Sequence, residues 1–363
     1  MIYLDNSATT FIKPRTVTEA MNRYMQTSGG NPGRGGHFMS MRASDTIYKC
    51  RESISKLLKV ESPEQIVLTP SATFGLNLVI KSVLNHNSHA VITDSEHNSV
   101  LRPVHEMCDY SVCSSPHDAL TKIKPNTKLL VVNHASNVNG RVADLEGYKK
   151  IARSMGVYLL LDASQSAGHI PLCADGIDFI ASSGHKGLFG PQGTGFLYVR
   201  KGIALTPLVS GGTGFHSESY TQPLDLPEGL ESGTLNGVGF AGLKEGVEYV
   251  LSHDNSIEQN LNRALKEGLS AIPKVKLYTP IHEETVPVIA FNIRGTDCVS
   301  VSEFLSEKYE ICVRSGLHCA PLMHKTLGTI KTGTVRASVS CFNRLWEIEK
   351  FLNIIDNKLS FGV

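Results

Sequence analysis

The sequence predicts an α/β protein that has a large, mostly parallel sheet domain and a smaller C-terminal α+β domain. Three observations support this fold class. The chain has 363 residues, which is more than the roughly 150 of an ordinary domain. Apolar runs of strand length alternate with helical patterns between about residues 40 and 200. After residue 200 a Gly/Pro-rich stretch and a different order of elements replace that alternation, which indicates a second domain.

The predicted large domain begins with a helix at 41–59, where Ile47, Cys50 and Ile54 fall on one face. A strand and a second helix, running to Val83, follow it. The apolar runs do not alternate with polar residues, which is typical of strands covered on both faces of a parallel sheet. We expect right-handed crossovers between these strands. The expected strands are 65–69, 90–93, 129–133, 157–162, 178–182 and 195–199.

The predicted second part follows a Gly/Pro-rich stretch at 207–239 and a helix at 239–252. The polar break SHDNS at 252–256 is the expected boundary. We therefore expect a large domain at 15–252, and a small domain that combines 1–14 with 253–363. The small domain is expected to contain helices at 257–271, 299–308 and 343–357, and strands near 275–278, 287–293, 310–314 and 334–339.

Composition and charge exclude several classes of protein. The formal net charge is +1, so the chain has no strong field to attract nucleic acid or an acidic membrane surface. No apolar run reaches the roughly 18 residues that a membrane span needs, and the N-terminus resembles no secretory signal. The eight cysteines are scattered without a C-x-x-C pair, which argues against a disulfide framework and a zinc site. We expect a cytoplasmic protein with reduced thiols and no metal.

Lys186 is the strongest candidate for chemistry. It lies in SSGHKGLFG, just after a buried strand, and its flanking glycines would allow the close approach of a ligand. Most lysines are solvated, but Asp162 ends the preceding strand 24 residues earlier. A lysine that binds an aldehyde covalently and a carboxylate that keeps a pyridine nitrogen protonated are what pyridoxal phosphate requires.

Three further segments follow predicted strands. TPSATFGLN at 69–77 starts a helix, where free backbone N–H groups at Ala72 and the hydroxyl of Thr73 could bind a phosphate. His97 would emerge at the carboxyl edge of the sheet, where its flat ring could stack on a flat cofactor. Asn137 offers an amide for a ring oxygen, and Gln165 lies one helical turn after Asp162.

The segment VRSGLHCAP at 313–321 places Arg314 and His318 close to Cys319. A cationic setting favours the thiolate, so Cys319 is the one cysteine of the eight with a reactive context. Arg336 lies in an apolar strand, and a buried arginine needs an anionic partner. That partner is either a substrate carboxylate, held through two hydrogen bonds, or an internal ion pair.

Together these residues resemble the class V aminotransferase family, and within it the cysteine desulfurases and selenocysteine lyases. YLDNSATT at 3–10 is similar to the family's N-terminal signature, and GHK with Asp162 and Gln165 is similar to its cofactor core. RSGLHCA at 314–320 resembles the compact cysteine loop of group II desulfurases. The similarity runs in order from Tyr3 to about Asn343. It implies the aspartate-aminotransferase-like fold, also called fold type I.

The resemblance implies roles for the residues at the cofactor. Lys186 would hold pyridoxal 5'-phosphate covalently, Asp162 would pair with the pyridinium and His97 would stack on the ring. Contacts to the ring oxygen would come from Gln165 and Asn137. A homodimer is implied because Thr234, in ESGTLN, would reach the phosphate of the neighbouring subunit. The other phosphate contacts would be Ala72, Thr73, Ser183 and His185.

The resemblance also implies a reaction. Arg336 would hold the carboxylate of L-cysteine or selenocysteine, with Asn137, Arg314 and His318 nearby. Cys319 would accept the sulfur as a persulfide and pass it to a thiol-bearing acceptor protein, leaving L-alanine.

Two departures from the family pattern leave the subfamily open. Leu317 replaces a second histidine, and Phe74 replaces a glutamate of the phosphate loop. The alternatives are selenocysteine lyase, cysteine sulfinate desulfinase and other class V enzymes, although a plain aminotransferase needs no Cys319. A non-catalytic scaffold would need neither Lys186 nor Arg336. A nicotinamide dehydrogenase is disfavoured because no G-x-G-x-x-G follows a first strand.

Overall fold

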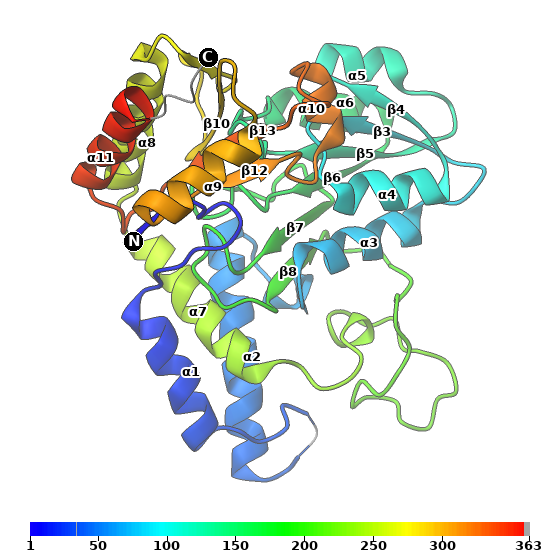
Figure 1. Cartoon of the computed structure of the whole chain (residues 1–363). Helices are drawn as coiled ribbons and strands as arrows, with labels where there is room; N and C mark the ends of the chain where they lie inside the picture. Colours follow the sequence, from blue (N-terminus) through cyan, green and yellow to red (C-terminus); the bar gives the residue numbers. More distant parts are fainter. Residues whose placement is uncertain (34, 359–363) are drawn as a thin grey trace.

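A computed structural model describes residues 1–33 and 35–358. Its centre is a seven-stranded sheet with the strand order β2-β8-β7-β6-β5-β3-β4 (Figure 1). All neighbouring strands pair in parallel except β8, which is antiparallel to both β2 and β7. The strands are β2 (Ile66–Thr69), β3 (His89–Thr93), β4 (Asp109–Cys113), β5 (Thr127–Asn133), β6 (Tyr158–Asp162), β7 (Phe179–Ser183) and β8 (Gly195–Val199).

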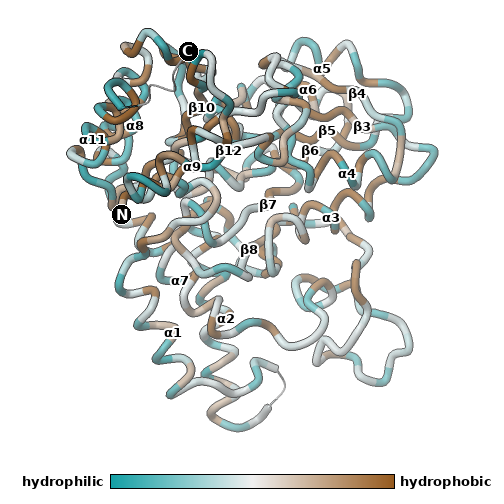
Figure 2. The backbone as a smooth tube through the Cα atoms, in the orientation of Figure 1, coloured by the Kyte–Doolittle hydropathy of each residue, from teal (hydrophilic) through white to brown (hydrophobic). Residues whose placement is uncertain are grey.

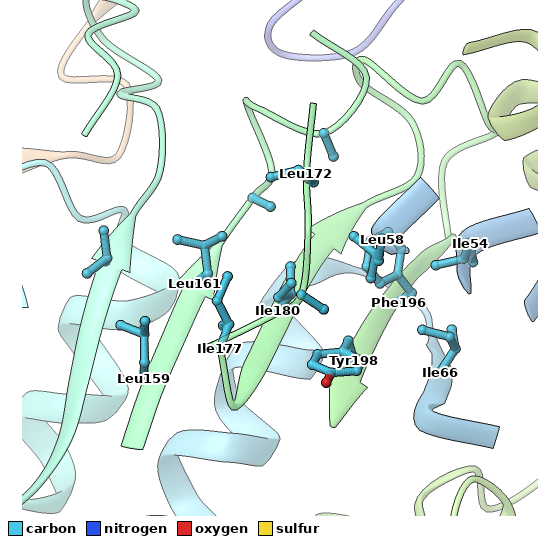
Figure 3. Packing of buried hydrophobic residues seen from close by; sticks show 14 of the residues in the cluster. Ile54, Leu58, Ile66, Leu159, Leu161, Leu172, Ile177, Ile180, Phe196 and Tyr198 are labelled. Carbon is cyan, nitrogen blue, oxygen red and sulfur yellow. The ribbon is translucent and has the colours of Figure 1, made fainter. Parts of the chain in front are cut away.

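Helices cover both faces of this sheet, and successive residues of β6 show why. Leu160 faces a core shared with α3 (Ala72–Val83) and α4 (Asn98–Met107). Its neighbours Leu159 and Leu161 face the opposite core, built with α2 (Phe38–Leu58), α6 (Leu145–Met155) and α7 (Gly237–Ser252). Figure 3 shows part of the second core, in which Ile54 and Leu58 of α2 lie over the sheet near Phe196 of β8. Burial on both faces explains the uniformly apolar strands.

A second, antiparallel sheet has the order β12-β13-β10-β9 and packs against α8, α9 and α11 (Figure 1). The N-terminal residues join this part of the chain, because β1 (Ile2–Tyr3) pairs with β11 (Ile311–Cys312). Its elements are α8 (Ser256–Ala271), β9 (Val275–Leu277), β10 (Val288–Ile293), α9 (Cys298–Tyr309), β12 (Arg314–Gly316), β13 (Thr334–Ser338) and α11 (Leu345–Asn357).

The fold class predicted from the sequence is confirmed, and most of the expected elements are present within a few residues. The strand expected at 310–314 is instead two short strands, β11 and β12. The sequence analysis placed no element on several segments that are regular in the structure: α1 (Arg15–Thr27), α4, β4, α5 (Pro116–Lys122), α6 and α10 (Pro321–Thr326). The proposed domain limits, 15–252 and 1–14 with 253–363, stay a prediction.

The segment between β8 and α7 extends away from the sheet as a long irregular loop with one 3-10 turn, η2 (Glu228–Leu230) (Figure 1). A second such turn, η1 (Pro63–Gln65), precedes β2. Figure 2 shows that the loop carries scattered apolar residues far from the central core. Val209, Phe215, Tyr220 and Leu224 are all exposed there. Within the described residues, no helix is long and apolar enough to cross a bilayer.

Candidate active site

Lys186 and Asp162 lie at the same edge of the central sheet. Asp162 is the last residue of β6, and it pairs with Ala181 in the neighbouring parallel strand β7. β7 ends at Ser183, and the next turn carries Lys186. Asp162 is 4% exposed and accepts a hydrogen bond from the Ser164 N–H. The sheet geometry thus brings a buried carboxylate and the lysine together, as the 24-residue spacing and the strand ends predicted.

The turn that carries Lys186 is fixed by backbone hydrogen bonds. The Gly184 N–H donates to the Thr194 carbonyl at 2.8 Å, and the Phe189 N–H donates to the Lys186 carbonyl at 2.9 Å. A Cβ on Gly187 would lie 2.5 Å from the Ala167 carbonyl oxygen. The glycines next to Lys186 therefore make room for the protein's own backbone. The expectation that they also allow the close approach of a ligand stays a prediction.

Burial lowers the pKa of Lys186 to about 8, with Asp162 opposing and Arg336 reinforcing the shift. The ammonium form loses hydration in this setting, so about a tenth of the amine is neutral at pH 7, far more than for a solvated lysine. A neutral amine is the nucleophile needed for covalent attachment to an aldehyde. Burial also lowers the pKa of the adjacent His185 to about 4, so its imidazole is uncharged.

His97 is the residue that caps the N-terminus of α4. Its Nδ1 accepts the Ser99 N–H at 3.1 Å and lies 2.8 Å from the Ser99 hydroxyl. Burial lowers the pKa of His97, and the charges of Asp162 and Lys186 both act on the ring. The imidazole is therefore a neutral, flat group in the same electrostatic environment as Lys186. Its stacking role stays a prediction.

The N-terminus of α3 is the expected phosphate site. Ser71 Oγ accepts the Phe74 N–H and the Ser71 carbonyl accepts the Gly75 N–H, so Ser71 is the capping residue. The N–H groups of Ala72 and Thr73 precede the first possible intrahelical bond and can bind an anion. Ser71 is a site residue that the sequence analysis missed, although a serine at a helix start is the ordinary capping signal.

Several buried polar atoms around Lys186 have no hydrogen-bond partner among the described residues, and they test whether a cofactor fits. Buried polar groups are normally paired, so a cluster of unpaired ones indicates a ligand. They belong to residues that the sequence analysis assigned to the cofactor or the substrate. The atoms are Asn137 Oδ1, Gln165 Oε1, His185 Nδ1 and Arg336 Nε. The residues present therefore fit a polar aromatic group with a phosphate.

Asp5 is a residue of the site that the sequence analysis did not assign. Its carboxylate accepts from Arg336 Nη2 at 3.0 Å and from Arg314 Nη2 at 2.9 Å. Arg336 also donates through Nη1 to the Asn137 carbonyl. Of the two partners considered for Arg336, the structure shows the internal ion pair. Arg336 Nε stays unpaired and buried, which leaves a donor for a substrate carboxylate.

The electrostatic setting of Cys319 differs from the cationic one that the sequence predicts. Cys319 is exposed, but the side chain of His318 is buried and its Nε2 lies 3.1 Å from the Thr334 carbonyl. Burial lowers the pKa of His318 to about 2, so this histidine supplies no positive charge to the thiol. Arg314 forms an ion pair with Asp5 and still interacts electrostatically with Cys319. A charge on Cys319 nevertheless acts on Lys186 and Arg336, which places the thiol beside the lysine site.

The backbone of this loop is unusual. His318 and Cys319 both have left-handed conformations, with φ of 47° and 56°. Side chains other than glycine rarely adopt this region, so the surrounding contacts must hold it. The Asn98 N–H donates to the Cys319 carbonyl at 2.7 Å, and Asn137 Nδ2 donates to the His318 carbonyl at 2.6 Å. These bonds attach the loop to α4 and to the segment after β5.

Thr234 does not lie with the other predicted site residues. It is exposed in the loop after η2, where none of the contacts described above reaches it. Its predicted role at a neighbouring subunit's phosphate stays a prediction. Across residues 1–33 and 35–358, no group of three or more His, Cys, Asp or Glu side chains is placed to hold a metal ion.

The fold and this site define a class of protein. The family model for class V aminotransferases matches residues 2–351, and the chain belongs to that family, whose members depend on pyridoxal phosphate. A probable cysteine desulfurase from Methanothermobacter thermautotrophicus is 32% identical, with 96% of this chain and 92% of the relative covered. The cysteine desulfurase CsdA from Escherichia coli is 30% identical, covering 100% and 95%.

Solved structures of cysteine desulfurases are also similar to this chain. The apo structure of a cysteine desulfurase from Thermococcus onnurineus has a TM-score of 0.91 at 32% identity, and the alignment covers 99% of this chain and 94% of that one. Escherichia coli CsdA, crystallised as an S-sulfonic acid, has a TM-score of 0.88 at 27% identity, with 99% and 95% covered. The predicted resemblance to the class V aminotransferases is confirmed.

Proposed function

We propose that this protein is a pyridoxal-phosphate-dependent cysteine desulfurase that converts L-cysteine to L-alanine and carries the sulfur on Cys319. The observation that supports this most directly is the combination of Lys186, Asp162 and Cys319. The lysine is partly neutral, the carboxylate is buried, and an exposed thiol shares their electrostatic environment. A plain aminotransferase has no use for the thiol. The relatives named above carry the same activity in their names.

The residues for the cofactor follow from the site. Lys186 would hold pyridoxal 5'-phosphate covalently, Asp162 would pair with its ring nitrogen and His97 would stack on its ring. Gln165 and Asn137 contact the ring oxygen. Ala72 and Thr73 at the N-terminus of α3, together with Ser183 and His185, would bind its phosphate. When bound, the cofactor supplies an electron sink for the electron pairs released at the substrate carbon atoms.

The chain's own residues perform the rest of the reaction. Arg336 binds the substrate carboxylate, and the Lys186 amine, with its lowered pKa, takes and returns the proton at Cα. The Cys319 thiolate attacks the substrate sulfur. An S–S bond forms on Cys319 as the C–S bond of the substrate breaks, and its electron pair stays with the carbon fragment. That fragment leaves as L-alanine after protonation, and the persulfide then passes to the thiol of an acceptor protein.

The active unit is a homodimer in this proposal. Thr234 is exposed, and it would contact the phosphate bound by the partner subunit. Large apolar side chains are exposed on α1 and α2 and on the neighbouring loop, as expected of a surface covered in an oligomer. They are Met25, Phe38, Met41, Tyr48, Tyr220 and Leu224. The eight free cysteines fit a reducing compartment, so we place the protein in the cytoplasm.

One experiment tests this function. The purified holoenzyme is exposed briefly to L-cysteine, alkylated and digested. The masses of its peptides are measured by mass spectrometry, and the released alanine is quantified. We expect alanine, and one additional sulfur on the peptide of Cys319 alone. Selenocysteine and cysteine sulfinate are assayed in parallel. Alanine release without a persulfide on Cys319 would contradict the desulfurase function and favour a class V enzyme that does not use the thiol.

A further inference from the structure

A cavity beside α8 is lined by none of the residues assigned to the cofactor or the substrate. Its volume is about 310 Å³, and it lies between α8, the turn at His169 and the segment 281–287. Figure 1 shows α8 next to α11, in the part of the chain that packs on the antiparallel sheet. Most of the lining residues are polar or charged. We call this space the α8 cavity.

Three polar residues on successive turns of α8 line the cavity. Glu258, Asn262 and Lys266 are four residues apart, so they form one stripe along the helix. They are 4%, 7% and 8% exposed, although the buried face of a helix is normally apolar. The stripe begins with a carboxylate, continues with an amide and ends with an ammonium group. Its charge therefore changes sign along the helix.

Lys266 is the positive end of this stripe. Its Nζ donates two long hydrogen bonds of 3.4 Å, to the Glu283 carbonyl and the Thr285 hydroxyl. Within the part of the chain that the structure describes, it forms no ion pair with a carboxylate. Burial lowers the pKa of Lys266. A buried ammonium group without a counter-ion is costly, so this position favours an anionic group.

Asn262 is the middle of the stripe, and its amide has a fixed orientation. Nδ2 donates to the Thr285 and Val286 carbonyl groups at 3.3 and 3.4 Å, whereas a flipped amide would place oxygen against oxygen. Oδ1 is buried and has no partner among the described residues, so it favours an N–H or O–H donor. Glu258, one turn earlier, holds its carboxylate 2.7 Å from His169 Nδ1 and adds negative charge on this side.

We propose that the α8 cavity is a binding site for a small zwitterionic amino acid, which places its carboxylate at Lys266 and its ammonium group at Asn262 Oδ1 and Glu258. A simple anion would pair with Lys266 but leave Asn262 Oδ1 without a donor, and it would meet the carboxylates of Glu258 and Glu267. A water molecule would satisfy only the amide. A zwitterion matches both ends of the stripe. This site is separate from Lys186 and goes beyond the proposed function.

The test measures the binding of L-proline to the holoenzyme by isothermal titration calorimetry. Proline carries a carboxylate and N–H donors, and its secondary amine forms no stable Schiff base with the cofactor. The titration is repeated after treatment with aminooxyacetate, which blocks the cofactor aldehyde and so excludes the active site. In both titrations we expect one proline per chain, with saturation at millimolar concentrations. N,N-Dimethylproline, which lacks the N–H donors, should bind at least about tenfold more weakly.

Variants of the stripe locate the site. Lys266→Met and Asn262→Leu keep the approximate size of each side chain and remove its polar group, and each should weaken proline binding at least about tenfold. Asn260→Leu is the matched control, because Asn260 lies on the same helix but is exposed and outside the cavity. Its dissociation constant should match the wild type. Thermal unfolding verifies that each variant is folded, and Lys266→Met decides the result if Asn262→Leu is not.

Several outcomes would overturn the proposal. Without saturable proline binding, the α8 cavity would be a hydrated space and no amino acid site. Binding that disappears after aminooxyacetate treatment would place proline in the active site instead. An unchanged affinity in Lys266→Met, or an equal loss in Asn260→Leu, would show that the stripe does not hold the ligand. No turnover is measured, so these outcomes are independent of the proposed function.

Discussion

The two loops that carry the proposed reacting groups are built in opposite ways. The backbone of the Lys186 loop is tightly packed, and a single added methyl group at Gly187 would collide with the Ala167 carbonyl. The Cys319 loop is exposed and has two consecutive residues in the left-handed region. The first loop excludes water from an amine, while the second presents a sulfur atom to the outside. One site therefore combines a fixed lysine, Lys186, which we call the anchor, with an accessible thiol, Cys319, which we call the carrier.

Burial affects the two kinds of group in opposite directions. It lowers the pKa of Lys186 to about 8, which favours the neutral, nucleophilic amine. Burial raises the pKa of the Cys50 thiol to about 12, which suppresses the thiolate. A lysine nucleophile benefits from a dry position, whereas a thiol there would be inactive. This difference explains why the anchor lies at a sheet edge and the carrier lies on an exposed turn.

The largest effect is expected from removing the anchor. Lys186→Ala should reduce alanine release from cysteine by at least about 10⁴-fold, because the variant loses both the covalent attachment and the proton carrier. The native absorbance of the bound cofactor should disappear as well. Lys201→Ala removes an exposed lysine and should behave as the wild type. If borohydride reduced a Schiff base between the cofactor and the Lys186→Ala protein, another lysine would be the anchor.

Replacing Cys319 should stop the reaction after cysteine has reached the cofactor and before alanine is released. Cys319→Ser should release alanine from cysteine at least about 10²-fold more slowly, because the serine hydroxyl is a poor nucleophile at neutral pH. Cysteine should still change the cofactor spectrum, since the anchor side of the site is intact. Cys173→Ser is the matched control, because Cys173 is also exposed. Wild-type alanine release in Cys319→Ser would make the thiol a bystander.

The lowered pKa of the anchor predicts a pH dependence. Protonated Lys186 cannot attack an aldehyde, and its neutral fraction rises with pH until it saturates above a pKa of about 8. The rate at which the cofactor-free protein combines with pyridoxal phosphate should rise about tenfold between pH 6 and 7 and level off above pH 8. Stopped-flow absorbance measures this rate. A rate that still increases steeply at pH 10 would show that the amine is as basic as a solvated lysine.

The smallest effect compares the packing of the two loops. Gly187→Ala should lower the free energy of unfolding by about 1–3 kcal/mol, since the new Cβ meets backbone that cannot move easily. Leu317→Ala, in the exposed loop, should change it by less than about 0.5 kcal/mol. Denaturant unfolding of the two holoenzymes measures both values. Equal losses would mean that the Cys319 loop is as tightly packed as the anchor loop.

The sequence predicts the part of the site that is organised by the large sheet. Asp162 and Lys186 follow adjacent buried strands, and the carboxyl ends of neighbouring strands meet at one edge, so their proximity follows from the pattern. The apolar strand runs likewise indicate a sheet covered on both sides. Short or partly polar elements such as β4 and α10 give no comparable periodicity, and β8 reverses direction for reasons that its apolar run does not encode.

Contacts between distant segments are what the pattern could not predict. Asp5 meets Arg336 across 331 residues, and a lone aspartate in an N-terminal segment has no local feature that indicates this partner. His318 and Arg314 were expected to surround the thiol because they are near it in sequence. His318 turns instead toward Thr334, whereas Arg314 forms an ion pair with Asp5 and still interacts electrostatically with Cys319. Nearness along the chain does not specify the direction of a side chain in an irregular loop.

The attachment of the N-terminal segment has a consequence for biosynthesis. Ile2 pairs with Ile311, and Asp5 forms a bridge to Ser338, so these residues find their partners only after about 300 further residues have been translated. The elements that carry Lys186 and Asp162 emerge much earlier. A chain that ends before β13 lacks Arg336 and also Ser338, the bridge partner of Asp5. The proposed carboxylate-binding residue Arg336 therefore joins the site later than the proposed cofactor residues Asp162 and Lys186 during synthesis.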